Sequence, residues 1–86
     1  MNFVEIIGLF AGTCVTFATI PQILKVWRTK KVKEISLKMF GILTFGIAVW
    51  IVYGILKKDF PIILTNSISF ILNLIMVYFI IYYEKE

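Results

Sequence analysis

The chain has 86 residues, of which 60% are hydrophobic and only 16% are charged, against roughly 25% charged residues in soluble domains. Three windows carry no charged side chain at all: Ile6–Leu24, Met39–Leu56 and Phe60–Tyr83. A helix of about 20 apolar residues crosses the roughly 30 Å hydrocarbon core of a bilayer. The windows exclude a water-soluble globule, whose surface would need more polar residues. They predict an all-α membrane protein of one domain, with three transmembrane helices at about residues 4–27, 37–56 and 60–83.

Residue types on which much enzyme chemistry depends are missing from the sequence. There is no histidine, and Cys14, inside the first window, is the single cysteine. A Cys/His zinc site, a disulfide within the chain and a Ser-His-Asp triad are therefore excluded. The windows also contain no carboxylate for acid–base catalysis. We expect no enzymatic activity, no cofactor and no bound metal, and we expect Cys14 to be a small packing residue.

The charged residues between the windows predict the orientation in the membrane. The segment Lys25–Lys38 holds six basic residues and one glutamate, whereas the connection Lys57–Asp59 is only weakly basic. Lysine and arginine in short loops mark the cytoplasmic side. We therefore expect the first loop and the C-terminus to be cytoplasmic and the N-terminus to lie outside. The same loop could also bind anionic lipid headgroups. Because orientation explains the basic charge, no nucleic acid partner is expected.

The first five residues contain only Glu5 as a charged side chain and lack the basic start of a signal peptide. We therefore expect the first window to remain in the mature protein. Late in that window, Pro21 precedes Gln22. A proline inside a helix releases the carbonyl four residues earlier, here that of Phe17, and produces a kink. In lipid this carbonyl must either be satisfied by another group, for which the hydroxyls of Thr13, Thr16 and Thr19 are candidates, or face a water-filled cavity. The kink is interpreted either as a hinge or as a static bend.

Small residues at helical spacing predict close helix packing. Gly8 and Gly12 form a G-x-x-x-G motif that Thr16 continues, and the second window contains Gly41, Gly46 and Gly54. These positions suit either packing within one chain or a seam between two chains. Three helices in lipid are expected to form a solid triangle without a lumen, so a pathway for a polar solute needs a second copy. Because both copies share one orientation, a parallel two-fold homodimer is predicted.

One stripe of residues at steps of three or four runs along the second window: Met39, Leu43, Gly46, Trp50, Tyr53 and Lys57. Tryptophan usually lies at the membrane interface, but Trp50 is only about 4 Å from the centre of its predicted span. An indole at that depth needs a partner for its N–H or a ligand face against which to stack. Packing against another helix is the alternative interpretation.

In the third window, Asn66 and Asn73 are seven residues apart and share a face with Asp59, Ile62 and Ser69. Asn66 is expected to lie in nearly the same layer of the membrane as Trp50. An asparagine in a membrane often serves only to join helices, contributing about 0.6–2 kcal/mol. Two copies of Asn66 beside two copies of Trp50 would instead present amide groups and flat apolar rings. That combination suits a sugar better than an ion.

These residues together resemble a known family. Three spans of this length, Pro21-Gln22 late in the first, the run Trp50–Gly54 in the second and Asn66 in the third are similar to a bacterial SemiSWEET. SemiSWEETs are the half-size relatives of the SWEET sugar transporters within the PQ-loop group. The resemblance covers the whole chain. It implies a homodimer in the bacterial inner membrane that binds a sugar in a central cavity and transports it by alternating access.

The resemblance also implies roles for particular residues. The substrate-binding residues of the family correspond to Trp50 and Asn66, and its hinge proline corresponds to Pro21, with Gln22 beside it. The gates correspond to residues near the two ends of the second span: Tyr53, Lys57 and Asp59 for the outer gate, and Met39 and Leu43 for the inner gate. Many members have arginine where this chain has Lys57. Lysine keeps the charge but lacks the planar guanidinium fork, so a looser ion pair is expected.

The charge-free windows further predict how transport is driven. Proton-coupled carriers place ionisable groups inside the membrane, and these windows contain none. We therefore expect facilitated diffusion of a neutral mono- or disaccharide down its gradient. Two alternatives remain: a non-transporting subunit of a larger membrane complex, and a PQ-loop carrier of another small metabolite. An ion channel is disfavoured, because neither a ring of charges nor a filter-like glycine run is present.

Overall fold

The computed structural model describes residues 2–84, and it consists of three helices joined by short connections. Helix α1 spans Phe3–Thr29, α2 spans Leu37–Lys57 and α3 spans Phe60–Glu84. Each is long and apolar enough to cross a membrane. The prediction of an all-helical protein with three candidate spans is therefore confirmed. Lys85 and Glu86, which the orientation argument counted in the C-terminal tail, lie outside the described residues.

The side chain that precedes each helix caps its N-terminus. Asn2 Oδ1 accepts the N–H of Glu5 at 2.8 Å, Ser36 Oγ accepts that of Met39 at 3.0 Å, and Asp59 Oδ1 accepts that of Ile62 at 3.2 Å. Free backbone N–H groups at a helix start are costly in an apolar environment, and such caps satisfy one of them at each start. The helix boundaries therefore follow from local sequence chemistry.

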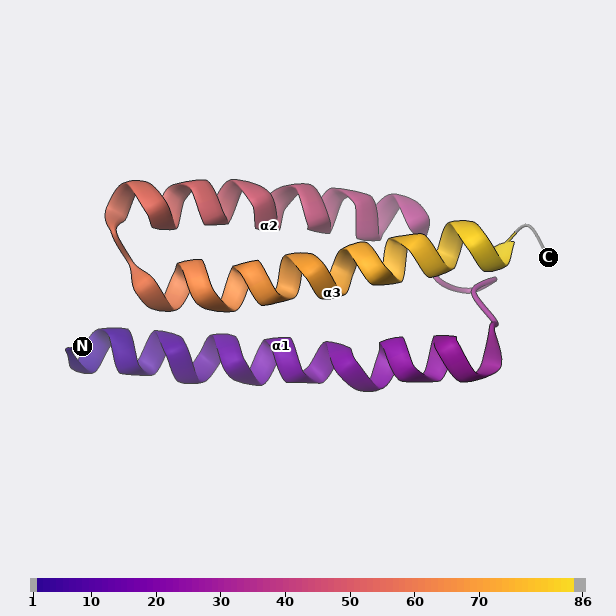
Figure 1. Cartoon of the computed structure of the whole chain (residues 1–86), viewed down its shortest axis with the longest axis horizontal. Coiled ribbons are helices and arrows are strands. Elements are labelled where there is room, and N and C mark those ends of the chain that lie inside the picture. The colour runs from indigo at the N-terminus through magenta and orange to yellow at the C-terminus, as the bar shows by residue number, and fades with distance from the viewer. Residues whose placement is uncertain (1, 85–86) are drawn as a thin grey trace.

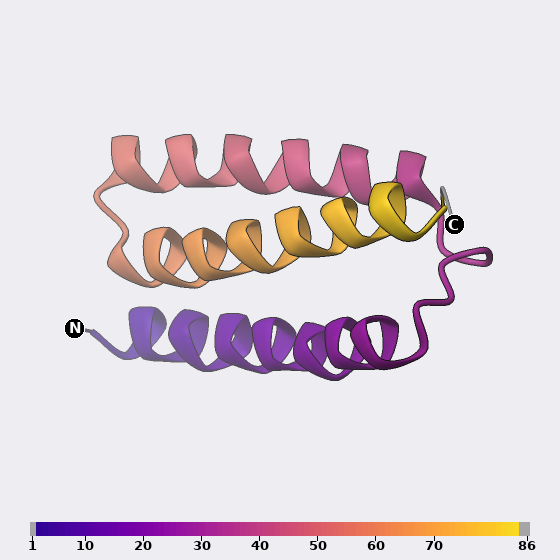
Figure 2. The same ribbon diagram turned by 45° about the vertical axis from the view of Figure 1, so that its right-hand side comes forward.

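The three helices form a row in which α3 lies between α1 and α2 (Figures 1 and 2). The molecule measures 48 × 21 × 15 Å, and over residues 2–84 the backbones of α1 and α2 stay apart. The expected solid triangle is therefore wrong. The reason lies in the connections. The two residues Lys58 and Asp59 force α2 and α3 to be antiparallel neighbours, whereas residues 30–36 are long enough to carry the chain past the end of α3.

The row has two distinct ends. The end that contains the Lys58–Asp59 turn and the start of α1 is here named the turn end, and the opposite end, which contains the loop 30–36, is named the loop end (Figure 1). The turn half and the loop half are the corresponding halves of the bundle. Helix α3 runs parallel to α1 and antiparallel to α2.

In the turn half, glycines bring both outer helices close to α3. A Cβ added at Gly12 would lie only 2.6 Å from Thr65 Oγ1, and one added at Gly54 would lie 2.8 Å from Ile62 Cγ2. Thr16 Oγ1 shares a hydrogen bond of 2.8 Å with Ser69 Oγ across the α1–α3 seam. Gly12 of the G-x-x-x-G motif and Thr16 thus serve packing within the chain, as one of the two interpretations of the motif expected.

In the loop half, large side chains fill the space between the helices. The buried cluster joins all three helices and the loop, and it consists of Ile23, Val26, Val32, Phe40, Met76 and Ile80. Met76 and Ile80 of α3 are each only 1% exposed. Cys14 lies outside this cluster and is exposed, although it was expected to be a packing residue.

Helix α1 continues through Pro21 without interruption. The neighbouring hydroxyls do not serve the carbonyl that Pro21 releases. Thr13 Oγ1 donates to Leu9 O at 2.7 Å, Thr19 Oγ1 lies 3.4 Å from Val15 O, and Thr16 pairs with α3. None of these three candidate hydroxyls therefore bonds to Phe17 O. Each threonine on α1 either bonds one turn back along its own helix or faces α3.

Candidate functional site

The packing contacts fix which residues lie at the same height in neighbouring helices. Gly54 of α2 packs against Ile62 of α3. The two helices are antiparallel, and each rises 1.5 Å per residue. Trp50, four residues before Gly54, therefore lies level with Asn66, four residues after Ile62. By the same count, Leu43, seven residues before Trp50, lies level with Asn73, seven residues after Asn66. The prediction that Trp50 and Asn66 share a layer is therefore supported by an observed contact rather than by span centres alone.

The same reasoning gives the heights on α1. Gly12 faces Thr65, and Thr16 faces Ser69. Because these two helices are parallel, Ile20 lies level with Asn73, and Pro21 lies one residue further towards the loop end. The proline is thus at the height where the close α1–α3 seam of the turn half gives way to the packing of the loop half.

A cavity of about 390 Å³ lies at the height of Asn73. All three helices and the connecting loop contribute to its lining, which includes Thr19, Gln22, Ser36, Met39, Leu43 and Asn73. Two sides of this lining carry hydroxyl or amide groups, and α2 supplies apolar side chains. Pockets of about 300–1,000 Å³ are typical of small-molecule sites. The lining can therefore surround a small neutral solute with both polar and apolar surfaces.

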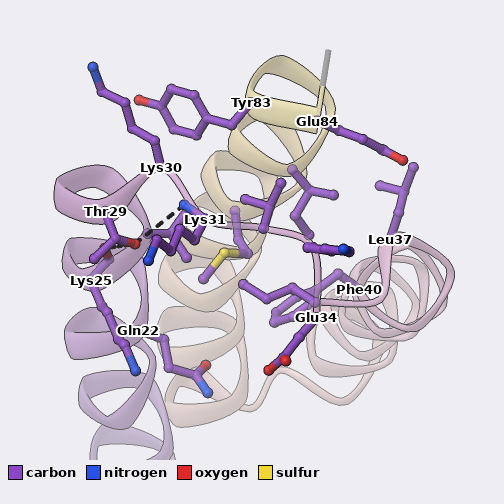
Figure 3. Close-up of a pocket in the computed structure, with 16 residues that line it drawn as sticks. Gln22, Lys25, Thr29, Lys30, Lys31, Glu34, Leu37, Phe40, Tyr83 and Glu84 are labelled. Atoms are coloured by element: carbon purple, nitrogen blue, oxygen red, sulfur yellow. Dashed lines mark hydrogen bonds between the residues drawn. The ribbon is translucent and has the colours of Figure 1, made fainter. Parts of the chain in front are cut away.

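A larger cavity of about 1020 Å³ opens at the loop end (Figure 3). Gln22 and Lys25 from α1 line one side and Leu37 from α2 lines the other, with the loop residue Glu34 between them. Gln22 and Glu34 also line the smaller cavity, so the two cavities adjoin. Four lysines and two glutamates make this mouth charged: Lys25, Lys30, Lys31, Lys33, Glu34 and Glu84.

The predicted substrate-binding pair, Trp50 and Asn66, lies closer to the turn end than these cavities do, on the same helix faces. Residues seven apart lie almost directly above one another on a helix. Trp50 therefore continues the face of α2 that Leu43 presents to the smaller cavity, and Asn66 continues the face of Asn73. Trp50 is 53% exposed and packs edge-on against Tyr53 at a centroid distance of 5.3 Å. Asn66 is partly buried, and its Nδ2 donates to Ile62 O at 3.0 Å.

Of the predicted gate residues, Met39 and Leu43 both line the smaller cavity, beside Gln22 of the predicted hinge. Tyr53, Lys57 and Asp59 lie towards the turn end. Asp59 caps α3 through Ile62 N–H, and within residues 2–84 it forms no salt bridge with Lys57. A gate made of these two charges within one chain is therefore not formed in this structure.

The sequence placed Asn73 on one face with Asn66 and assigned it no role beyond the usual one of an asparagine that joins membrane helices. The structure shows it to be 3% exposed, and its Nδ2 donates to Ser69 O at 2.8 Å within α3. Within residues 2–84 it therefore forms no hydrogen bond to another helix. The sequence signal was its seven-residue spacing from Asn66, which places both amides on one face.

Comparison with known proteins identifies the family. The model of a family described as "Sugar efflux transporter for intercellular exchange" matches residues 2–86. The sugar transporter SemiSWEET of Bradyrhizobium diazoefficiens is 41% identical over 69 residues, which are 80% of each chain. SemiSWEET of Leptospira biflexa is 39% identical over 75 residues, covering 87% of this chain and 88% of the other.

Solved structures agree with these sequence matches. The crystal structure of a bacterial homologue of SWEET transporters, 41% identical, matches with a TM-score of 0.91 and covers 95% of this chain and 99% of the other. The crystal structure of SemiSWEET in an inward-open conformation, 30% identical, matches with a TM-score of 0.87 and covers 99% and 91%. Together with the three membrane-spanning helices, these matches show that the chain is a multi-pass membrane protein that belongs to the SemiSWEET branch of the SWEET sugar transporter family.

Proposed function

We propose that two copies of this chain form a parallel homodimer that transports a neutral mono- or disaccharide by alternating access. One observation carries this proposal: Trp50 and Asn66 lie at the same height on adjacent helices, on faces that continue into a cavity with both polar and apolar side chains. A sugar ring offers hydroxyls for an amide and an apolar face for an indole. The matched relatives are named as sugar transporters, which supports the same substrate class.

The open sides of this site support a second copy. Trp50 and Tyr53 are 53% and 47% exposed in the single chain, and a Cβ added at Gly46, between Leu43 and Trp50 on the same stripe, would meet nothing within 4 Å. An α1–α3–α2 row offers a face rather than an enclosed tunnel. A partner related by a two-fold axis along the membrane normal would cover that face with its own Trp50 and Asn66.

The proposed orientation puts the loop end in the cytoplasm, because the basic residues of the Lys25–Lys38 segment lie there. Tyr53, Lys57 and Asp59 then form the outer gate together with the partner's copies, and Met39 and Leu43 form the inner gate. Movement of the loop half of α1 about Pro21 and Gln22 alternately opens these two ends. Because the spans carry no ionisable side chain, the sugar gradient alone drives net transport.

The test is counterflow of radiolabelled sugars into proteoliposomes that contain the purified protein. A panel that includes glucose and sucrose should identify at least one substrate. Trp50→Ala and Asn66→Ala should each reduce its counterflow at least tenfold, since each removes a direct contact with the sugar, while the dimer persists in detergent. Thr44→Val is the matched control, because Thr44 Oγ1 donates to Phe40 O at 2.6 Å within α2 and lines neither cavity. Wild-type counterflow of every sugar in both alanine variants would refute the site.

The proposed energetics has a separate test. With an imposed proton gradient and no sugar gradient, the proteoliposomes should not concentrate sugar. Accumulation above the external concentration would show that transport is coupled to protons and would refute facilitated diffusion, while leaving the assignment of the sugar site unchanged.

A further inference from the structure

Nearly all buried polar side chains in the spans have a hydrogen-bond partner. The hydroxyls of Thr44 and Thr65 donate to backbone carbonyls one turn earlier, at 2.6 and 2.8 Å, and Thr16 pairs with Ser69 at 2.8 Å. Within residues 2–84, one buried side-chain oxygen or nitrogen has no partner, and it is Asn73 Oδ1. Such an atom is unfavourable in an apolar environment unless a donor reaches it in some state of the protein.

The amide of Asn73 is held by its nitrogen, while its acceptor oxygen has no partner within residues 2–84. Its Nδ2 donates to Ser69 O at 2.8 Å, which holds the side chain against α3. Asn66 is held in the same way, by a bond of 3.0 Å from its Nδ2 to Ile62 O. The two asparagines therefore repeat one arrangement, and seven residues of helix separate them by about 10 Å along the pathway.

The surroundings of Asn73 match a hydroxylated solute. The cavity of about 390 Å³ that it lines also receives Thr19 and Gln22 from α1, Ser36 from the loop, and Met39 and Leu43 from α2. Hydroxyl and amide groups thus come from two sides, while α2 supplies apolar surface at the same height. An anionic ligand would find no opposite charge beside Asn73, because Glu34 is the only ionisable residue of this lining.

We propose that Asn73 is a second sugar-contacting residue, which defines an inner subsite about 10 Å from the Trp50 and Asn66 layer. In this subsite a sugar hydroxyl donates to Asn73 Oδ1 as the sugar moves between the central site and the loop end. The oxygen is enclosed in this conformation, so the contact forms when the loop half of α1 moves outward next to Pro21. This inference rests on the proposed sugar transport and adds a second binding position to the transport pathway.

A cysteine protection experiment tests direct contact. Asn73→Cys is prepared in a Cys14→Ala background, because Cys14 is exposed and would react. Labelling by a small, membrane-permeant methanethiosulfonate reagent is measured in proteoliposomes with and without saturating substrate sugar from the counterflow panel. We expect labelling without sugar and at least fivefold slower labelling with it. The matched control is Glu84→Cys, since Glu84 lines the larger mouth but not the smaller cavity.

The outcomes separate this inference from the proposed function. Absence of labelling, or labelling that sugar does not slow, would overturn the inner subsite. Equal protection of Asn73→Cys and Glu84→Cys would also overturn it, because the sugar would then act by closing the loop end. Failure of the wild-type protein to carry any sugar of the panel would refute the proposed function itself, and the Cys14→Ala parent is used once it is shown to transport like the wild type.

A transport measurement complements the labelling. Asn73→Leu removes the acceptor at similar volume, and the loss of one neutral hydrogen bond should raise the KM for counterflow about five- to tenfold with little change in the maximal rate. Thr44→Val should leave both parameters unchanged. An unchanged KM in Asn73→Leu would contradict a sugar contact at this position.

Discussion

The two halves of the bundle are held together by different kinds of packing. In the turn half, Gly12 and Gly54 allow α1 and α2 to approach α3 so closely that an added Cβ would lie 2.6 and 2.8 Å from its side chains. In the loop half, large side chains such as Met76 and Phe40 fill the space between the helices, and both cavities lie there, the larger of them drawn in Figure 3. The same three helices thus meet through small residues at one end and large ones at the other.

This difference has a mechanical consequence. A seam of small residues has one favourable arrangement, because any displacement separates or overlaps atoms near the backbone. Long side chains such as methionine can adopt other rotamers and keep contact while the helices shift. The turn half of each chain is therefore the rigid part, and the loop half is the part that can rearrange. Pro21 lies close to the border between them.

The largest expected effect is that of Gly12→Val, which acts on the rigid seam. Its Cβ would lie within 2.7 Å of three atoms of Thr65, including the Thr65 Cβ, so rotation of the threonine side chain cannot relieve the overlap. We expect α1 to separate from α3, with a loss of about 3 kcal/mol or more in the free energy of unfolding. Thermal unfolding in detergent, followed by tryptophan fluorescence, measures this loss.

Gly8→Ala is the matched control for the seam, because its Cβ would lie 4.0 Å from Pro61 Cβ, at ordinary contact distance. Its stability should stay within about 0.5 kcal/mol of the wild type. Equal destabilisation by Gly8→Ala and Gly12→Val would show that the seam is not the tight contact on which the comparison of the two halves depends.

The contrast between the halves also shows which features of the fold and of the site could be predicted from the sequence. The charge-free windows predicted the helices, because crossing a bilayer imposes a length and a composition. They did not predict the row, since apolar residues cover every side of a membrane helix and do not reveal which neighbour it contacts. Within the site, the common height of Trp50 and Asn66 followed from counting residues. The unpaired oxygen of Asn73 did not, because it depends on which groups of three helices come within hydrogen-bond distance.

Met76→Ala tests the loop half and should have the next largest effect. Met76 is 1% exposed and lies in the cluster with Phe40 and Ile80. Removing its side chain should lower the unfolding free energy by about 2–3 kcal/mol. This value is at the lower end for such a core truncation, because the loop half can partly close around the cavity that is left. The same measurement in detergent gives the value. A loss as large as that of Gly12→Val would indicate that the loop half is as inflexible as the turn half.

Pro21→Ala tests the border between the halves and should affect transport more than stability. Alanine restores the backbone N–H that proline lacks, so α1 becomes stiffer at the height where the loop half begins. We expect counterflow to slow about fivefold, equivalent to about 1 kcal/mol in the activation free energy, with unchanged or slightly raised stability. Gly41→Ala is the control, since its Cβ would meet nothing within 4 Å and it stiffens α2 instead. Wild-type counterflow in Pro21→Ala would refute the hinge.

The smallest expected effect concerns how the helices end, and it shows whether the halves differ in anything besides packing. Lys58 at the turn end and Lys30 at the loop end both follow a helix in the left-handed conformation, each with φ of 57°. Glycine adopts this conformation without the steric cost of a Cβ, so Lys58→Gly and Lys30→Gly should each raise the unfolding free energy by about 0.5–1 kcal/mol. Lys57→Gly removes the same charge inside α2 and should lower the unfolding free energy by a similar amount.

Equal gains at Lys30 and Lys58 would mean that both ends terminate their helices alike, so that the contrast between rigid and adaptable halves arises from side-chain packing alone. A gain confined to Lys58 would instead show that the loop relaxes around Lys30, and would extend the adaptable half to the backbone of residues 30–36.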